Sequence, residues 1–384
     1  MNKNSLFIGI LKETSFQENR VPLVPNAVAL LCNNGHEIIL ESGAGKLSNF
    51  SDGEYSEAGA KIVYNTEDIF KANIILKIAP PTENEILYLK ANHSLISMLQ
   101  FGTQTEKFFL NLASKKVNAL AFDFIKDKIG IYSIIQSMSE IAGSTSMLIA
   151  AEYLSNVKHG RGEMLGGITG IPPSNVVIIG AGTVGEFAAR TAIGLGANVE
   201  IFDSALYKLR RLQNHLGSRL FTSILSPDTL ARSLKNSDVA IGAMAPKNGI
   251  SRCIVSEEMV SQMSAGSVII DVNIDVGGCF ETSEIRNHSD PTFIKYGVIH
   301  YCVPNIPSRV AHTASYAISN VITPILLNIG KAGGLAEFVW FDQGVRFGIY
   351  MYKGIITKKH ISEQYKMPYK DIELLLASQK LDLS

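Results

Sequence analysis

The segment 176–185, which reads VVIIGAGTVG, restricts the possible fold of this chain more than any other feature. Its three glycines match the pattern G-x-G-x-x-G, between a run of β-branched residues and the helical stretch 186–195. Such a strand, tight turn and helix bind a pyrophosphate, because the glycines let the backbone approach and the helix N-terminus favours negative charge. The predicted phosphate-binding residues are Gly180, Gly182, Thr183, Val184 and Gly185.

An acidic residue, Asp203, ends the next β-rich run, 18 residues beyond Gly185. A carboxylate at this distance accepts hydrogen bonds from the ribose hydroxyls of an adenosine and repels a 2′-phosphate. The cofactor predicted from the residues is therefore NAD and not NADP. The alternative is a glycine-rich turn in an unrelated α/β protein, which the flanking strand and helix disfavour.

Short β-rich runs alternate with helical segments through most of the chain. Those expected in the first part are Leu6–Leu11, Glu37–Glu41, Asn73–Ile78, Ser94–Leu99 and Ala119–Phe122. Those expected after the glycine-rich stretch 160–173 are Val176–Ile179, Val199–Phe202, Arg219–Thr222, Val239–Ile241, Ser267–Val272 and Val298–Cys302. Most connections are long enough for a crossover helix, which predicts parallel sheets covered on both faces.

The predicted fold class is α/β, with two Rossmann-like domains. We expect residues 139–312 to form the NAD-binding domain, a doubly wound parallel sheet. From about Ala311 the chain is mainly helical in pattern. We expect this C-terminal helical part to return to the first domain, so that the substrate and catalytic domain is discontinuous, 1–138 plus 313–384.

The bulk composition limits the function classes. The chain has 35 basic and 35 acidic side chains, so a basic face for nucleic acid is not expected. No segment approaches the roughly 18 uninterrupted apolar residues of a membrane helix. The four cysteines lie far apart in sequence, which is typical of reduced thiols and of neither a disulfide frame nor a metal site. These patterns predict a cytoplasmic enzyme without a metal.

Several motifs resemble the alanine dehydrogenase family, which shares its opening motif with the nucleotide-binding subunit of proton-translocating transhydrogenase. The matching segments are 18–25, 50–55 with 58–60, 138–143, 170–173, 272–282, 300–301 and 305–307. The resemblance extends to about Ile329. It implies reversible, NAD-dependent oxidative deamination of L-alanine to pyruvate and ammonia, by a homo-oligomer that is commonly a hexamer, with a dimer as the alternative.

The resemblance also implies roles for single residues. Arg20 corresponds to the ligand of the substrate carboxylate, although composition alone favours a surface arginine. Lys77 corresponds to an ammonium at the substrate, as opposed to a lysine that extends out of a core strand. Asp275, which follows the run Ser267–Val272, is interpreted as a proton acceptor or water-orienting group, with a turn-capping aspartate as the alternative. The further cofactor-binding residues implied are Ser139, Lys208, Met244, Ile274 and Asn305.

One position departs from the family. Gln100 stands where alanine dehydrogenases usually carry an acid–base histidine, and a glutamine binds a substrate carbonyl without exchanging a proton. No other histidine is a clear replacement, and His93 and His312 are interpreted as solvated or structural. The first hypothesis is therefore alanine dehydrogenase, in which Asp275 and Lys77 carry the proton chemistry. The alternatives are a related dehydrogenase of another amino or imino acid and a non-catalytic, transhydrogenase-like NAD-binding protein.

Overall fold

The computed structural model describes residues 5–156, 159–217, 220–244 and 253–382. The chain forms two compact units, of which one comprises Met1–Ser137 with Ala311–Ser384 and the other Met138–Val310. Each unit contains one mainly parallel sheet with helices packed on it, which confirms the predicted α/β fold class of two Rossmann-like domains.

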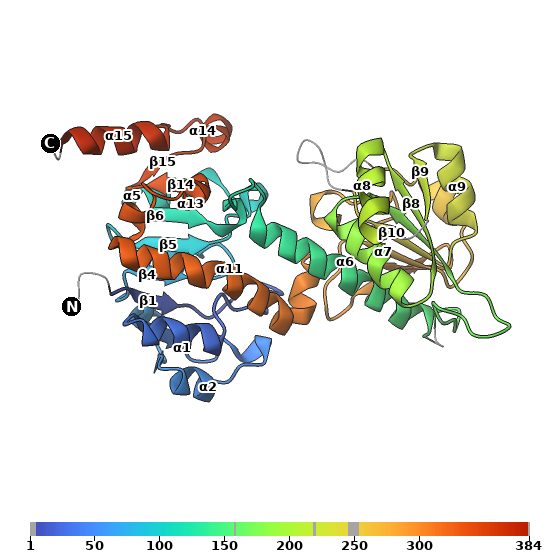
Figure 1. The fold of residues 1–384 in the computed structure, drawn as a ribbon, viewed down its shortest axis with the longest axis horizontal. Coiled ribbons are helices and arrows are strands. Elements are labelled where there is room, and N and C mark those ends of the chain that lie inside the picture. The colour runs from blue at the N-terminus through green and yellow to red at the C-terminus, as the bar shows by residue number, and fades with distance from the viewer. Residues whose placement is uncertain (1–4, 157–158, 218–219, 245–252, 383–384) are drawn as a thin grey trace. The chain divides into compact units, whose positions relative to one another are not determined.

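The first unit has an eight-stranded sheet of order β15-β14-β6-β5-β4-β1-β2-β3, and Figure 1 labels β1, β4, β5, β6, β14 and β15. Its strands are β1 (Phe7–Ile10), β2 (Glu37–Glu41), β3 (Lys61–Val63), β4 (Ile74–Leu76), β5 (Ser94–Ser97), β6 (Asn118–Ala121), β14 (Ile349–Tyr352) and β15 (Ile355–Ile356). Strands β1–β6 are parallel, and the order of these six is the doubly wound one. Strands β1–β3 therefore extend the sheet to one side and strands β4–β6 to the other, so the strand order reverses between β1 and β4.

Helices cover this sheet on both faces. They are α1 (Pro25–Asn33), α2 (Asp52–Glu57), α3 (Thr66–Ile69), α4 (Glu83–Tyr88), α5 (Glu106–Ser114), α11 (Ala311–Ala332), α12 (Leu335–Phe338), α13 (Gln343–Gly348), α14 (Lys359–Tyr365) and α15 (Ile372–Asp382). On one face, buried residues of α3, α4, α5 and α14 form a core cluster with alternate strand residues. Two of the helix starts, at Ser51 and Thr82, carry complete capping boxes, which explains why helices begin there.

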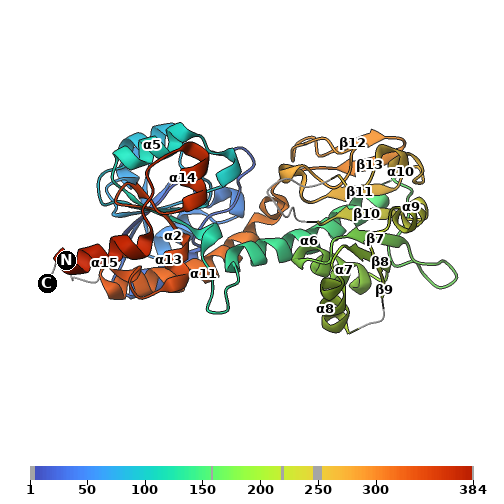
Figure 2. The same cartoon turned by 90° about the horizontal axis from the view of Figure 1, so that it is seen from above.

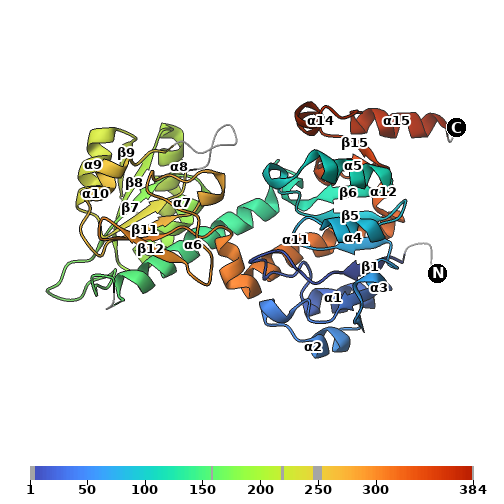
Figure 3. The same ribbon diagram turned by 180° about the vertical axis from the view of Figure 1, so that it is seen from behind.

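The C-terminal part differs from its prediction. It was expected to be helical, but Ile349–Tyr352 and Ile355–Ile356 are strands, and Figure 3 shows α14 and α15 following β15. Strand β14 pairs antiparallel with β6, and β15 pairs antiparallel with β14. The segment IYMY consists of aromatic and other large apolar residues, all buried, which favours a strand that fills the sheet edge. The expected return of this part to the first unit is observed, as a mixture of helices and strands.

Helix α11 is the described segment most similar to a membrane helix in composition. The stretch Ile306–Ala332 is long and apolar enough to cross a membrane by length and composition alone, although core helices share these properties. In this structure α11 packs within the first unit. The hydroxyl of Ser315 accepts a hydrogen bond from the backbone N–H of Val21 at 2.9 Å and lies 2.9 Å from the hydroxyl of Ser48. Buried hydroxyls of this kind bind the helix to the first loop of the unit.

The second unit has a seven-stranded sheet of order β12-β13-β11-β10-β7-β8-β9. Its strands are β7 (Asn175–Ile179), β8 (Asn198–Asp203), β9 (Phe221–Ile224), β10 (Val239–Gly242), β11 (Val268–Asp271), β12 (Thr292–Lys295) and β13 (Val298–Tyr301). All pairs are parallel except β12 with β13, so the predicted parallel sheet is confirmed apart from this antiparallel edge strand. Of the expected strand Arg219–Thr222, residue Arg219 lies outside the described residues.

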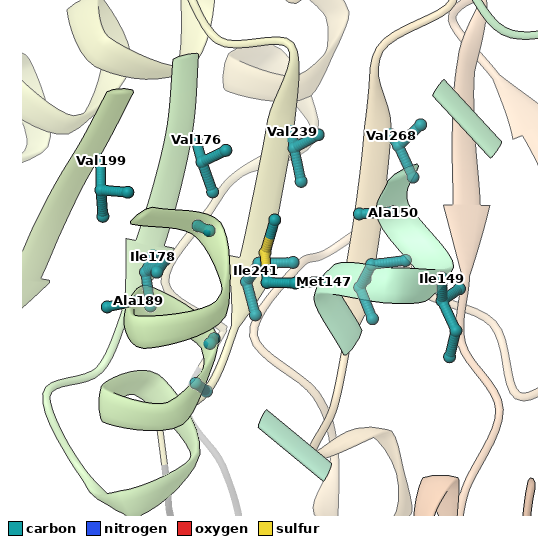
Figure 4. Close-up of a cluster of buried hydrophobic side chains, with 14 of the residues drawn as sticks. Met147, Ile149, Ala150, Val176, Ile178, Ala189, Val199, Val239, Ile241 and Val268 are labelled. Atoms are coloured by element: carbon teal, nitrogen blue, oxygen red, sulfur yellow. The ribbon is translucent and has the colours of Figure 1, made fainter. Parts of the chain in front are cut away.

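Helices pack on both faces of the second sheet as well. They are α6 (Ser133–Leu154, which begins just before the unit), α7 (Thr183–Gly194), α8 (Leu206–Leu216), α9 (Pro227–Lys235) and α10 (Glu257–Ser261). Figure 2 shows α7 and α8 on one side of the sheet and α9 and α10 on the other. Figure 4 shows the side chains Val176, Val199, Val239 and Val268 of four neighbouring strands on the face covered by α6 and α7. Near-continuous apolar strands are expected where both faces are buried.

Candidate functional site

The carboxyl edge of the second sheet brings the predicted cofactor residues together. Gly180 follows β7, Asp203 ends β8, Met244 follows β10, Ile274 follows β11 and Asn305 follows β13. These strands are neighbours in the order β13-β11-β10-β7-β8 and run parallel, so the five residues lie along one edge. The order reverses between β7 and β10, which is where open α/β sheets bind ligands.

The glycine turn is shaped for a dinucleotide. Gly180 has φ = 116°, and a Cβ there would lie 2.5 Å from the carbonyl oxygen of Ala243. A Cβ on Gly185 would lie 1.8 Å from the carbonyl oxygen of Gly180. By contrast, a Cβ on Gly182 would meet no described atom within 4 Å, and no described side chain caps the start of α7. The space beside Gly182 is therefore free of described atoms, and the first backbone N–H groups of α7 lie next to it. This arrangement fits a pyrophosphate.

Asp203 is buried directly behind this turn. Its Oδ2 accepts a hydrogen bond from the backbone N–H of Ala181, and its Oδ1 accepts one from that of Ala205, both at 2.8 Å. The ammonium of Lys208 lies 3.8 Å from Oδ2, so the two residues predicted for the adenosine end are adjacent. The negative charge thus lies where the ribose of NAD would be recognised.

Ser139 belongs to α6, which touches α7 closely. A Cβ on Gly143, one helical turn after Ser139, would lie 2.3 Å from the carbonyl oxygen of Val184. Residues four apart lie on the same face of a helix. Ser139 is therefore on the face of α6 that packs against the first turn of α7.

Asp275 lies in the 3-10 turn Ile274–Val276 that follows β11, and the residue as a whole is exposed to solvent. Partial burial of its carboxyl group raises the pKa of Asp275 above the ordinary aspartate value. The turn ends at Gly277, with φ = 107°, followed by Gly278, with φ = 69°. Both glycines adopt left-handed backbone, which explains the glycine pair after Asp275.

In the first unit, a buried charged cluster lies at the point where the strand order reverses. Lys77 follows β4, Glu13 follows β1, and β1 and β4 are neighbours. The Lys77 ammonium donates to both carboxylate oxygens of Glu85, at 2.9 and 3.1 Å, and lies 3.8 Å from Glu13. The Lys77 side chain is 0% exposed, so in this structure the buried ammonium is paired with Glu85 and lies near Glu13.

Arg20 is also buried and has a carboxylate partner. Its Nε and Nη2 donate to the two oxygens of Glu18 at 2.7 and 2.6 Å, and Nη2 lies 3.9 Å from the sulfur of Met98. A bidentate pair of this kind fixes the plane of the guanidinium. Since Met98 follows β5, the arginine lies at the same carboxyl edge as Lys77.

Gln100 lies just beyond β5 and is exposed, with left-handed backbone at φ = 46°. The buried carboxylate of Asp123, which follows β6, accepts a hydrogen bond from the backbone N–H of Leu99 at 3.1 Å and so holds this turn.

Two histidines that were considered as replacements make local contacts. His93 accepts a hydrogen bond from the backbone N–H of Lys90, and His312 lies within hydrogen-bond distance of the carbonyl oxygen of Ser48. Neither of these contacts is with Gln100 or with the turn that carries it.

Sequence reasoning missed the carboxylates that support these residues. Glu13, Glu18 and Glu85 were not proposed, and neither was Asp271, the last residue of β11. Glu13 and Asp271 carry the signal that identified Asp203 and Asp275, namely an acidic residue at or after the end of an apolar run. Glu18 and Glu85 carry no such signal, because Glu18 lies in a loop without periodicity, two residues before Arg20, and Glu85 reaches Lys77 from helix α4.

The buried Glu13 should make the free energy of unfolding depend on pH. Burial raises its pKa from 4.5 to about 7, against the opposing effect of Lys77. Between these values the native state binds the proton more tightly than the unfolded state, so stability falls as pH rises from about 4.5 through 7. Relative to Glu13→Gln, the wild-type unfolding free energy should fall by about 1–3 kcal/mol between pH 5 and 8, as measured by urea unfolding. Exposed Glu57→Gln is the control, and a pH-independent difference for Glu13→Gln would contradict the assignment.

No group of three His, Cys, Asp or Glu with metal-binding geometry occurs among the described residues. The four cysteines are free thiols, and Cys279 and Cys302 are buried.

Comparison with known proteins identifies relatives along nearly the whole chain. The models "Alanine dehydrogenase/PNT, N-terminal domain" and "Alanine dehydrogenase/PNT, C-terminal domain" match residues 9–142 and 146–359. Alanine dehydrogenase 2 of Staphylococcus aureus strain Mu50 is 37% identical over 367 residues, which cover 95% of this chain and 98% of the relative.

Solved structures give the same picture. An L-alanine dehydrogenase is similar with a TM-score of 0.88 and 31% identity, covering 94% of this chain and 99% of that one. A transhydrogenase from Sinorhizobium meliloti is similar with a TM-score of 0.78 and 23% identity, covering 92% and 99%, a likeness that shows the fold.

Proposed function

The chain belongs to the alanine dehydrogenase/PNT family, and on this premise we propose that it catalyses the reversible, NAD-dependent oxidative deamination of L-alanine to pyruvate and ammonia. The observation that carries the proposal is that one sheet edge holds the glycine turn, Asp203 and the Asp275 loop together. The near full-length similarity to alanine dehydrogenases supports alanine as the amino acid.

The reaction requires that the substrate amine lose a proton, that its Cα lose a hydride, and that water add to the resulting imine. NAD, when bound, accepts the hydride. We assign the phosphates to the turn that holds Gly182 and the start of α7, and the adenosine ribose to Asp203 with Lys208 beside it. Ser139, Met244, Ile274 and Asn305 complete the proposed cofactor site.

Asp275 is proposed as the group that accepts the proton or orients the water. Its raised pKa brings it nearer to neutral pH, which improves proton transfer. Gln100 would donate a hydrogen bond to the substrate carbonyl. Since Lys77 is paired with Glu85 and Glu13, we assign it to the maintenance of this cluster and leave the proton chemistry to Asp275.

Arg20 is proposed to bind the substrate carboxylate, with Glu18 fixing the guanidinium plane. In Arg20→Lys, a point charge replaces the planar fork, and neither bidentate pair can form. The KM for pyruvate should rise about 10- to 100-fold, as expected for the loss of about 1.4–3 kcal/mol of binding. Affinity for NADH should stay as in the wild type. Arg232→Lys, on the exposed face of α9, is the matched control, and an unchanged KM in Arg20→Lys would contradict the role.

We further propose a cytoplasmic homo-oligomer, a hexamer or a dimer. The segment with the bridge between Ile168 and Ile171 exposes Met164 and both isoleucines, each more than half exposed. An apolar patch of this kind marks an interaction surface. Light scattering of the purified protein would measure the number of subunits, and a monomer would contradict the proposal.

The test of the function is NAD reduction, followed at 340 nm, with L-alanine and a panel of other L-amino acids. L-alanine should give the highest kcat/KM. If NADH binds but only another amino acid is oxidised, the altered Gln100 position has changed the substrate. If none is oxidised, the chain is an NAD-binding protein without this activity.

A further inference from the structure

Asp271, the last residue of β11, is 0% exposed and uses one carboxylate oxygen for several contacts. Its Oδ2 accepts hydrogen bonds from the backbone N–H of Cys279 at 2.8 Å, from that of Phe280 at 3.3 Å, and from the hydroxyl of Ser283 at 2.7 Å. The donors follow Asp271 by eight to twelve residues. These hydrogen bonds therefore close the loop 272–283, which begins after β11 and folds back onto the Asp271 carboxylate at the end of that strand.

Asp275 lies in the middle of that loop. The backbone N–H of Gly278 donates to the carbonyl oxygen of Asn273 at 3.0 Å, across the turn that carries Asp275. A Cβ on Gly278 would lie 2.5 Å from Oδ2 of Asp271. The loop thus wraps around the Asp271 carboxylate, and the Asp275 backbone is held on both sides.

The same carboxylate also faces the end of β10. A Cβ on Gly242 would lie 3.0 Å from Oδ1 of Asp271 and 2.9 Å from the Cβ of Cys279. Oδ1 has no hydrogen-bond partner among the described residues. Since Met244 follows β10, Asp271 lies between the Asp275 loop and a strand end that we assign to the cofactor.

We propose that Asp271 is a positioning residue that holds Asp275 in its reactive place, an inference that rests on the proposed role of Asp275. Oδ2 of Asp271 accepts hydrogen bonds from three donors of the loop, the backbone N–H groups of Cys279 and Phe280 and the hydroxyl of Ser283. Removing the carboxylate leaves them buried without that acceptor, and the loop then moves to find another or water. Asp275 would move with it, and a displacement of about 1 Å lowers catalysis strongly.

The test uses the full chain with Asp271→Ala, Asp271→Asn and Ser283→Ala, and with exposed Asp290→Asn as the matched control. Hydrogen–deuterium exchange of peptides that contain Cys279 and Phe280 reports the loop, and NADH titration counts the folded sites. In Asp271→Ala, amide protection at these two residues should be lost, and kcat per NADH-binding site should fall about 10- to 100-fold. The Kd for NADH should stay within about threefold, because the glycine turn and Asp203 are untouched.

Asparagine keeps a carbonyl oxygen that accepts from the same amides, so Asp271→Asn should recover most of the protection and most of kcat. Ser283→Ala removes one donor and should give a smaller loss. Wild-type protection with wild-type kcat in Asp271→Ala would overturn the proposal, as would a loss of kcat without a change in exchange. If the wild type turns over no substrate, the proposed function fails, whereas the exchange data still decide whether Asp271 holds the loop.

Discussion

Replacement of Asp275 by asparagine should lower kcat for pyruvate amination by about 10²- to 10⁴-fold, the usual contribution of a positioned acid or base. Asparagine has the same shape and cannot accept a proton, so the affinity for NADH should not change. In the wild type, burial raises the pKa of Asp275, and kcat should therefore fall as the pH falls through that raised value and the carboxylate becomes protonated. Steady-state kinetics between pH 5 and 9 would measure both effects.

The matched control is Asp228→Asn, at an exposed aspartate in α9 of the same unit. It should retain the wild-type kcat and pH profile. An Asp275→Asn variant with undiminished kcat would contradict the assignment and transfer the proton chemistry to another group, for which Glu13 is a candidate because burial raises its pKa to about 7.

Replacement of Gly185 by alanine should raise the Kd for NADH by at least about 100-fold. The new Cβ would lie 1.8 Å from the carbonyl oxygen of Gly180, a backbone atom of the same turn, so α7 must move away from β7. Overpacking of this kind costs about 1–3 kcal/mol or more of stability and displaces the amides that we assign to the phosphates. Fluorescence titration with NADH and thermal unfolding would measure the two effects.

The same helix provides the control. A Cβ on Gly194 would meet no described atom within 4 Å, and the residue is exposed at the end of α7. Gly194→Ala should leave NADH binding unchanged and stabilise the protein by up to about 1 kcal/mol. Equal effects of the two substitutions would mean that the close approach at Gly185 does not determine binding.

The glycine turn and the strand ends beside it could be predicted because their signal is local in sequence. A β-branched run, three glycines and a helix specify the turn between β7 and α7, and the next strand ends at Asp203 as expected. Parallel pairing then brings the ends of β10, β11 and β13 to the same edge. Once the fold class is known, the position of Met244 and Asn305 follows from the strand order.

The charged cluster of the first unit could not be predicted in this way. Glu85 reaches Lys77 from the first turn of α4, and Glu13 reaches it from the loop after β1. Nothing in the apolar run around Lys77 indicates that its ammonium is completely buried and paired. Such pairs depend on side-chain packing between loops, which no periodicity records.

The missed strands have a different cause. Strand β12 is an antiparallel edge strand with intermediate or exposed residues, so it lacks the apolar run of the parallel strands. Strand β14 is only four residues long and directly follows helix α13. Its partner β6 precedes it by more than 200 residues, and that distant contact decides its conformation.

The most direct test of the proposed function is NADH oxidation by the purified wild-type protein with pyruvate and ¹⁵N-ammonium, beside glyoxylate and 2-oxoglutarate. We expect turnover that requires both pyruvate and ammonium, with labelled L-alanine as the product. Rates with the other two acids should be at least about tenfold lower, as expected for differences of about 1.4 kcal/mol in transition-state binding. Tight NADH binding without ammonium-dependent turnover on any of the three acids would contradict the proposed function.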